Sequence, residues 1–99
     1  MNEYAVLSSI EIESVVKGRK WNILIKESYG SWEGSFRFDS DGRIQETIPL
    51  VGTGYYNDRS WEVKNDTLIL DKTDVCKVLK IDEGVYLLIM DNSPYAIMN

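Results

Sequence analysis

Residues 31–44, the run SWEGSFRFDSDGRI, constrain the fold more than any other part of this chain. Aromatic or small residues alternate with polar ones as far as Phe38, and alternation with period two is typical of a strand that buries one face. The pattern stops at Asp41-Gly42, a pair that favours the positive φ angles of a tight hairpin turn, and resumes at Ile44. The run therefore predicts antiparallel β-sheet, and it carries no catalytic chemistry.

The segment from Ser8 to Gly18 is predicted to form one short helix before the sheet begins. Ser8 and Glu11 fit a capping box, in which the hydroxyl and the carboxylate each accept a hydrogen bond from a free backbone N–H. Gly18 stands where the end of a helix favours a left-handed residue. A strand is the competing interpretation, because residues 10–13 alternate. The capping signals favour the helix.

After Gly18 the chain alternates strand patterns with turn signals about every ten residues, which is typical of a β-sandwich or barrel. We expect about eight strands, at residues 21–26, 32–39, 43–48, 61–63, 67–70, 75–81, 84–90 and 95–98. Short connections make sequential strands neighbours in a meander, and closure of the meander hides its edges. The expected fold is all-β: a small antiparallel up-and-down barrel or meander with one short N-terminal helix, as a single domain over residues 1–99.

Composition and charge disfavour several classes of partner. Ninety-nine residues allow one domain, and 16 acidic against 11 basic residues give a net charge of -5. The two signs are interspersed, whereas a nucleic-acid binder needs clustered Lys and Arg. No apolar run approaches the roughly 18 residues that span a bilayer, and the N-terminus does not resemble a signal peptide. We therefore expect a cytoplasmic protein that binds neither nucleic acid nor membrane.

The chain has no histidine, which excludes Ser-His-Asp and Cys-His arrangements and every histidine metal ligand. Its single cysteine, Cys76, lies in an apolar-rich segment and is expected to be a core residue. Asp39 and Asp41 suggest a calcium loop, but such a loop needs glycine at its sixth position, and Gly42 falls at the fourth. Turn chemistry explains both aspartates. We expect no enzyme activity, no metal and no cofactor.

The order of these features resembles the small bacterial lipocalin-like domains of the calycin group. The resemblance covers roughly residues 7–90 and begins with Gly18, Trp21 and the strand and hairpin of residues 32–42. It continues through Gly54-Tyr55-Tyr56, Trp61-Glu62-Val63 and residues 66–70. The resemblance implies a barrel with a helix at its base and a non-enzymatic binding function. The ligand it implies is small and largely apolar, and enters the open end.

Four aromatic residues are the candidate ligand-binding residues at that open end: Trp32, Tyr55, Tyr56 and Trp61. The bend at residues 55–61, YYNDRSW, offers stacking surfaces and hydrogen-bond donors of the kind that hold sugars or side chains of a protein partner. The alternative is a wide turn with solvated polar residues and with aromatic rings that point inward.

Glu46 is the carboxylate expected to point inward, because it shares the strand phase of Ile44 and Ile48. Glu33 and Glu62 fall on the outward phase, which argues against the pair of acids that glycoside hydrolysis needs. An inward Glu46 requires a partner, and the sequence does not nominate one.

A filled barrel that acts through its outer surface, as a protein-interaction or inhibitor module, is the alternative function. Leu24, Ile69 and one phase of residues 77–90 would then form an exposed apolar stripe. Residues 85–90, VYLLIM, are apolar on both phases, which predicts burial on two sides. Either the helix or a second copy of the chain would cover one side, so a homodimer belongs to this interpretation.

Overall fold

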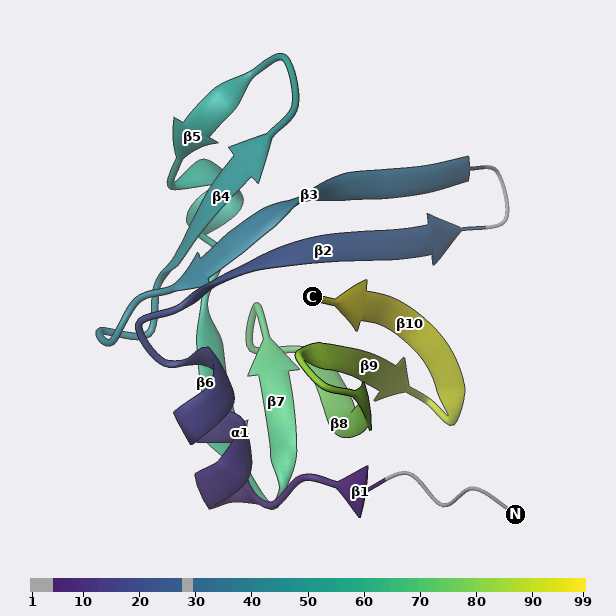
Figure 1. Ribbon diagram of the computed structural model, residues 1–99. Helices are drawn as coiled ribbons and strands as arrows, with labels where there is room; N and C mark the ends of the chain where they lie inside the picture. Colours follow the sequence, from purple (N-terminus) through teal and green to yellow (C-terminus); the bar gives the residue numbers. More distant parts are fainter. Residues whose placement is uncertain (1–4, 28–29) are drawn as a thin grey trace.

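A computed structural model describes residues 5–27 and 30–99, and these form one curled antiparallel sheet with a single α-helix (Figure 1). The elements in chain order are β1 (Ala5–Val6), α1 (Ser9–Val16), β2 (Lys20–Glu27), β3 (Gly30–Phe38), β4 (Ile44–Ile48), β5 (Gly52–Gly54), the 3₁₀ turn η1 (Tyr56–Asp58), β6 (Trp61–Lys64), β7 (Thr67–Leu70), β8 (Asp74–Asp82), β9 (Val85–Met90) and β10 (Ser93–Met98). The expected all-β class is confirmed. Two very short strands, β1 and β5, were not predicted.

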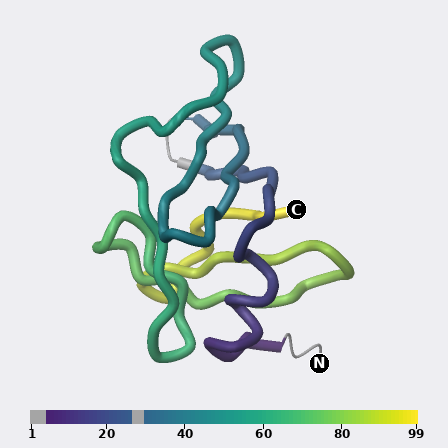
Figure 2. The backbone as a smooth tube through the Cα atoms, turned by 90° about the vertical axis from the view of Figure 1, so that its left-hand side faces the viewer, coloured from purple at the N-terminus to yellow at the C-terminus, as the bar shows by residue number. Residues whose placement is uncertain are grey.

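The sheet curls so that its last strand meets its first long strand. The strand order is β5-β4-β3-β2-β10-β9-β8-β7-β6, and β1 pairs with β8. The open seam therefore lies in the middle of the sequence, between β4–β5 and β6. One isolated bridge, Arg43 with Ser60, crosses this seam, and the Trp61 N–H donates to the Gly42 carbonyl oxygen at 3.0 Å. The β4–β5 hairpin projects from the sheet beyond this bridge (Figures 1 and 2).

The hairpin turns use two different geometries. Both central residues have positive φ in the turns at Asn65-Asp66, Asp71-Lys72 and Asp91-Asn92, as tight two-residue turns require. At Asp41-Gly42 only the glycine has a positive φ, of 89°. The expected hairpin turn therefore joins β3 and β4, with a positive φ at Gly42 and not at Asp41. The Asp39 N–H donates to the Arg43 carbonyl oxygen at 2.9 Å and closes this loop.

The predicted helix begins with the predicted capping box. The Ser8 N–H donates to Glu11 Oε1 at 3.0 Å, and the Glu11 N–H donates to Ser8 Oγ at 3.3 Å. Gly18 follows the helix with φ 71°. The buried side chains of Ile12 and Val16 face the core, and the helix contacts β6 and β7. Of the helices in the described ranges 5–27 and 30–99, none is long and apolar enough to span a membrane.

A continuous line of aromatic rings fills the interior of the curled sheet. The ring centroids of Trp32 and Phe36 lie 5.7 Å apart, those of Phe36 and Phe38 lie 6.1 Å apart, and those of Phe38 and Trp61 lie 5.9 Å apart. We call these four residues the aromatic line. Trp21 extends the packing toward the helix, because its Nε1 donates to a carbonyl oxygen of α1 at 3.0 Å. Such ring pairs prefer these tilted and edge-to-face geometries.

Gly34 allows the Trp32 ring to lie flat against β3. A Cβ atom at Gly34 would lie 2.6 Å from both the Thr47 carbonyl oxygen and Cη2 of Trp32. We expect Gly34→Ala to lower the free energy of unfolding by about 1–3 kcal/mol, because overpacking forces the backbone or the ring to move. Urea denaturation measures this difference. Ser31→Ala, at an exposed position of the same strand, is the control and should change stability by less than about 0.5 kcal/mol. Unchanged stability of Gly34→Ala would contradict the close packing.

Candidate functional site

The four candidate ligand-binding residues lie at different places in the fold. Trp32 and Trp61 stand at the two ends of the aromatic line, and Trp61 is only 9% exposed. Tyr55 follows β5 beside the seam, and its side chain is 41% exposed. Tyr56 packs over Gly54, where an added Cβ would lie 3.3 Å from the ring. A shared ligand pocket for these residues stays a prediction.

Asp39 brings Tyr55 and Trp61 together. Its Oδ2 accepts a hydrogen bond from the Tyr55 hydroxyl at 2.5 Å, and its Oδ1 accepts one from Arg37 Nε at 2.8 Å. Its backbone carbonyl oxygen accepts a third from Trp61 Nε1 at 2.8 Å. The guanidinium of Arg43 lies 3.8 Å from the centre of the Tyr55 ring. The exposed tyrosine is therefore held in place by the hairpin loop, and this cluster joins the two sides of the seam.

The surroundings of Asp39 lower its pKa from the ordinary value of 3.8. Burial acts in the opposite direction and raises the pKa, but the hydrogen bonds from Tyr55 and Arg37 stabilise the carboxylate and outweigh it. A carboxyl group whose pKa is lower in the folded than in the unfolded chain stabilises the fold above its unfolded pKa. This contribution is lost as the pH falls through the folded pKa.

We expect Tyr55→Phe to raise the pKa of Asp39 toward 3.8, because the hydroxyl hydrogen bond is removed. Wild-type stability should consequently fall more steeply than that of Tyr55→Phe as the pH drops below about 4. Carboxyl ¹³C NMR titration measures the pKa, and urea denaturation at several pH values measures the stability. Tyr56→Phe is the matched control and should leave the pKa of Asp39 unchanged. An equal pKa in wild type and Tyr55→Phe would show that the hydroxyl does not stabilise the carboxylate.

Glu46 points inward, as its strand phase predicted, and is 1% exposed. Its partner is Arg59, whose Nε donates to Glu46 Oε1 at 3.0 Å while its Nη1 donates to Asp71 Oδ2 at 2.8 Å. The guanidinium also lies 5.3 Å from the centre of the Phe36 ring. Sequence reasoning missed Arg59 because the bend at residues 55–61 was expected to be solvated or to face a ligand. The sequence signal that could have found Arg59 is the inward Glu46 carboxylate, which requires a cation as its partner.

The Glu46–Arg59 pair holds the seam closed from inside the sheet. Removing one partner of a buried pair leaves an uncompensated charge, so Arg59→Met should lower the free energy of unfolding by about 3–5 kcal/mol. The double variant Glu46→Leu/Arg59→Met should recover much of this loss, because no buried charge then remains. Urea denaturation of the single and double variants measures both effects. Arg37→Met is the control and should cost far less, because that ion pair is exposed. Wild-type stability of Arg59→Met would contradict this role.

The buried polar side chains of the interior have hydrogen-bond partners. Within residues 5–27 and 30–99, every buried side-chain nitrogen or oxygen has a hydrogen-bond partner, and no three metal-ligating side chains cluster. Cys76 is fully buried, as expected, and burial raises the pKa of its thiol to about 12. The thiol is therefore protonated at neutral pH.

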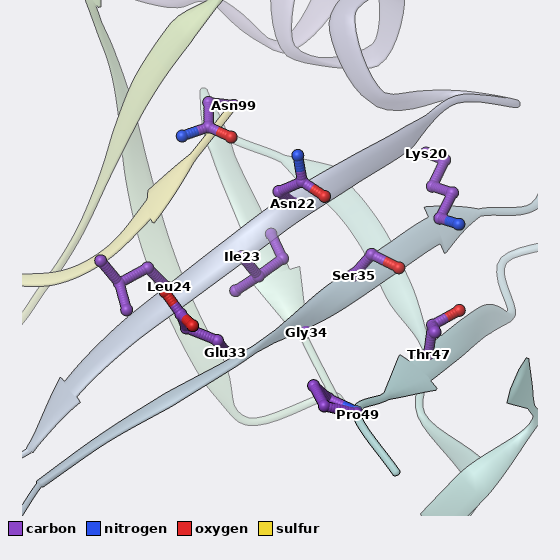
Figure 3. Close-up of a pocket in the computed structure, with 10 residues that line it drawn as sticks. All are labelled: Lys20, Asn22, Ile23, Leu24, Glu33, Gly34, Ser35, Thr47, Pro49 and Asn99. Carbon is purple, nitrogen blue, oxygen red and sulfur yellow. The ribbon is translucent and has the colours of Figure 1, made fainter. Parts of the chain in front are cut away.

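A groove of about 550 Å³ lies on the opposite, outer face of β2, β3 and β4, next to the last residue of the chain (Figure 3). Lys20 and Glu33 lie toward its two ends, and Ser35 and Thr47 lie between them. Leu24 provides apolar surface at the end that carries Glu33. The four aromatic candidates are not among the residues that line this groove.

Five apolar residues form one row across the outer face beside this groove: Leu24, Ile97, Leu87, Leu79 and Val6. Each is directly opposite the next across a neighbouring pair of antiparallel strands, and residues opposite each other share a face of the sheet. Val6 is 53% exposed, and the other four are partly exposed. We call these five residues the outer row.

The outer row matches only part of the predicted apolar stripe. It contains Leu24 and one phase of residues 77–90, whereas Ile69 lies off the row and pairs with Val75. The helix, which was one expected cover for this segment, packs instead against β6 and β7. The outer row therefore remains partly exposed on the side of the sheet away from the core.

Comparison with known protein families, with curated proteins and with solved structures finds no match to this chain. A curled antiparallel sheet hosts many unrelated functions and does not by itself identify a lipocalin. The relationship to lipocalin-like domains stays a prediction from the sequence.

Proposed function

We propose that this protein is a non-enzymatic interaction module that binds a protein partner through the outer row and the adjoining groove. One contrast carries the proposal. The aromatic line and the Glu46–Arg59 pair occupy the interior, whereas a continuous set of apolar side chains lies on the outside.

The outer row has the properties of a contact surface. Contiguous apolar side chains on the surface of a small soluble domain often mark a contact surface. Covering it would gain roughly 25 cal/mol for each Å² of apolar area removed from water. Lys20 and Glu33 in the groove would form part of a polar rim, which orients a partner more than it adds affinity.

A small, largely apolar ligand is the second candidate function, and the groove is the observation that favours it. Its volume of about 550 Å³ lies in the range of small-molecule sites, roughly 300–1,000 Å³. Leu24 would contact the apolar part of such a ligand, and Asn22 and Thr47 would orient its polar groups. The open end with Trp32, Tyr55, Tyr56 and Trp61 is the other location that the lipocalin-like resemblance implies.

Native mass spectrometry of the protein purified from its own host separates the two functions. For the proposed interaction module we expect a chain without a small-molecule adduct, alone or bound to another polypeptide chain. A small molecule bound at one per chain, and lost on denaturing extraction, would instead establish the ligand-binding function.

In-cell photo-cross-linking tests the proposed surface directly. With a photoreactive residue at Leu87, in the middle of the outer row, we expect cross-linking to another polypeptide chain. The matched control is the same substitution at Glu62, an exposed position of β6 away from the row. Absence of cross-linked product at Leu87, or equal product at both positions, would overturn the proposed surface.

A further inference from the structure

We infer that the free edge of β3, from Gly30 to Glu33, binds an extended segment of a protein partner as an added strand, with an apolar side chain opposite Trp32. We call this part of β3 the open edge. An added strand needs the backbone of the open edge and not the outer row, so this binding mode goes beyond the proposed function. Strand addition takes its affinity from main-chain hydrogen bonds and its specificity from alternate side chains.

The backbone groups of the open edge point away from β2. Successive residues of an antiparallel strand direct their N–H and C=O groups to opposite neighbours. The Asp39 N–H donates to the Arg43 carbonyl oxygen on the β4 side at 2.9 Å, so every second residue back along β3 faces the same way. Ser31 and Glu33 therefore direct their N–H and C=O groups toward the β4 side, where a further strand can bind.

β4 leaves this side of β3 because it turns away at Pro49. Among the described residues, its pairing with β3 ends at Ser35 with Thr47, and Figure 1 shows the β2–β3 hairpin extending beyond β4. Proline has no N–H to donate to a ladder. The Val51 N–H then donates to the Ile48 carbonyl oxygen at 3.0 Å and closes a turn that leads into β5. Within the described residues, the open edge is therefore paired on its β2 side alone.

Space for an added strand adjoins the open edge. The groove of about 550 Å³ is lined by Glu33 and Gly34 on β3, and by Thr47 and Pro49 at the end of β4 (Figure 3). The two strands therefore border a hollow at the point where they separate, and a bound segment can enter it. A strand edge with unpaired backbone groups is a template for pairing with another chain.

The side chains of the open edge define the chemistry of the bound segment. Trp32 is partly exposed on the inner face of the sheet, so an apolar side chain opposite it covers the indole ring. Glu33 is exposed on the outer face, so a lysine or arginine opposite it forms a cross-strand ion pair. Ser31 is exposed on the same face and suits a polar side chain. The segment therefore reads basic, apolar, polar, and the net charge of -5 on the chain also favours a basic segment.

An NMR titration of the full chain with a synthetic peptide tests the inference. The probe is the acetylated and amidated peptide Thr-Val-Lys-Val-Thr-Val-Thr, whose central lysine, valine and threonine match the open edge. We expect the amide signals of Ser31 and Glu33 to shift downfield and their hydrogen exchange to slow by about tenfold or more as new hydrogen bonds form. The amides of Trp32 and Gly34 already point toward β2, so they are the internal control and should change much less.

Two N-methylated versions of the probe test the main-chain contact without altering the protein. The lysine N–H faces the open edge, so its methylation should weaken binding by about tenfold or more, because it removes a hydrogen bond and places a methyl group between the strands. The N–H of the following valine points away from the open edge. Methylation there is the matched control and should leave the affinity within about threefold.

Glu33→Pro tests the same contact from the protein side. Proline is tolerated on an edge strand where the N–H faces solvent, so this variant should fold. It should bind the probe about tenfold more weakly or worse, because it lacks the donor. Glu33→Gln is the matched control: it keeps the N–H and removes only the charge, so it should weaken binding by less than about fivefold.

The outcomes distinguish the open edge from other sites. Equal shifts at Ser31, Trp32, Glu33 and Gly34, no shift at millimolar peptide, or equal affinity for the two methylated probes overturns the inference. Shifts confined to the outer row also overturn it. Slowed exchange of Ser31 and Glu33 that grows with protein concentration without peptide identifies a second copy of the chain as the occupant, and overturns the basic segment. Photo-cross-linking at Leu87 tests the proposed function separately, so either can fail alone.

Discussion

The contact of Arg59 with two carboxylates is the interaction on which the rest of the structure depends. Its guanidinium contacts Glu46 on β4 and Asp71 after β7, so it links two groups of strands whose backbones, in the described residues, pair across this seam through one isolated bridge. A buried carboxylate is costly unless it is paired and hydrogen-bonded. The seam therefore closes over a polar pair, and the aromatic line from Trp32 to Trp61 packs beside it.

Closing the seam in this way fills the interior with rings and with the Glu46–Arg59 pair. The proposed contact surface lies on the outside of the sheet. The pairing of β10 with β2 then sets Ile97 beside Leu24 and completes the outer row. The outer row takes its residues from five different strands, so it forms only when the sheet closes and the core is filled.

The local parts of this structure could be predicted because each depends on neighbouring residues. The capping box needs only Ser8 and Glu11, and strand phase alone places Glu46 inside. β5 was missed because Gly52-Thr53-Gly54 has no hydrophobic alternation, and its strand character comes from pairing with β4. The hairpin turn at Asp41-Gly42 was predicted, but its positive φ is found at Gly42 alone, in a loop that the Asp39 N–H closes by donating to the Arg43 carbonyl oxygen.

The sequence by itself determined the all-β class, the helix and the face on which most strand residues lie, because these follow from periodicity and short-range hydrogen bonds. Only the tertiary structure decided which strands are neighbours across the closure, and hence that Arg59 is the partner of Glu46 and that Leu24, Ile97, Leu87, Leu79 and Val6 form one row. Periodicity specifies the face of a residue but not the strand beside it. Pairing between distant segments is decided by packing of the whole chain.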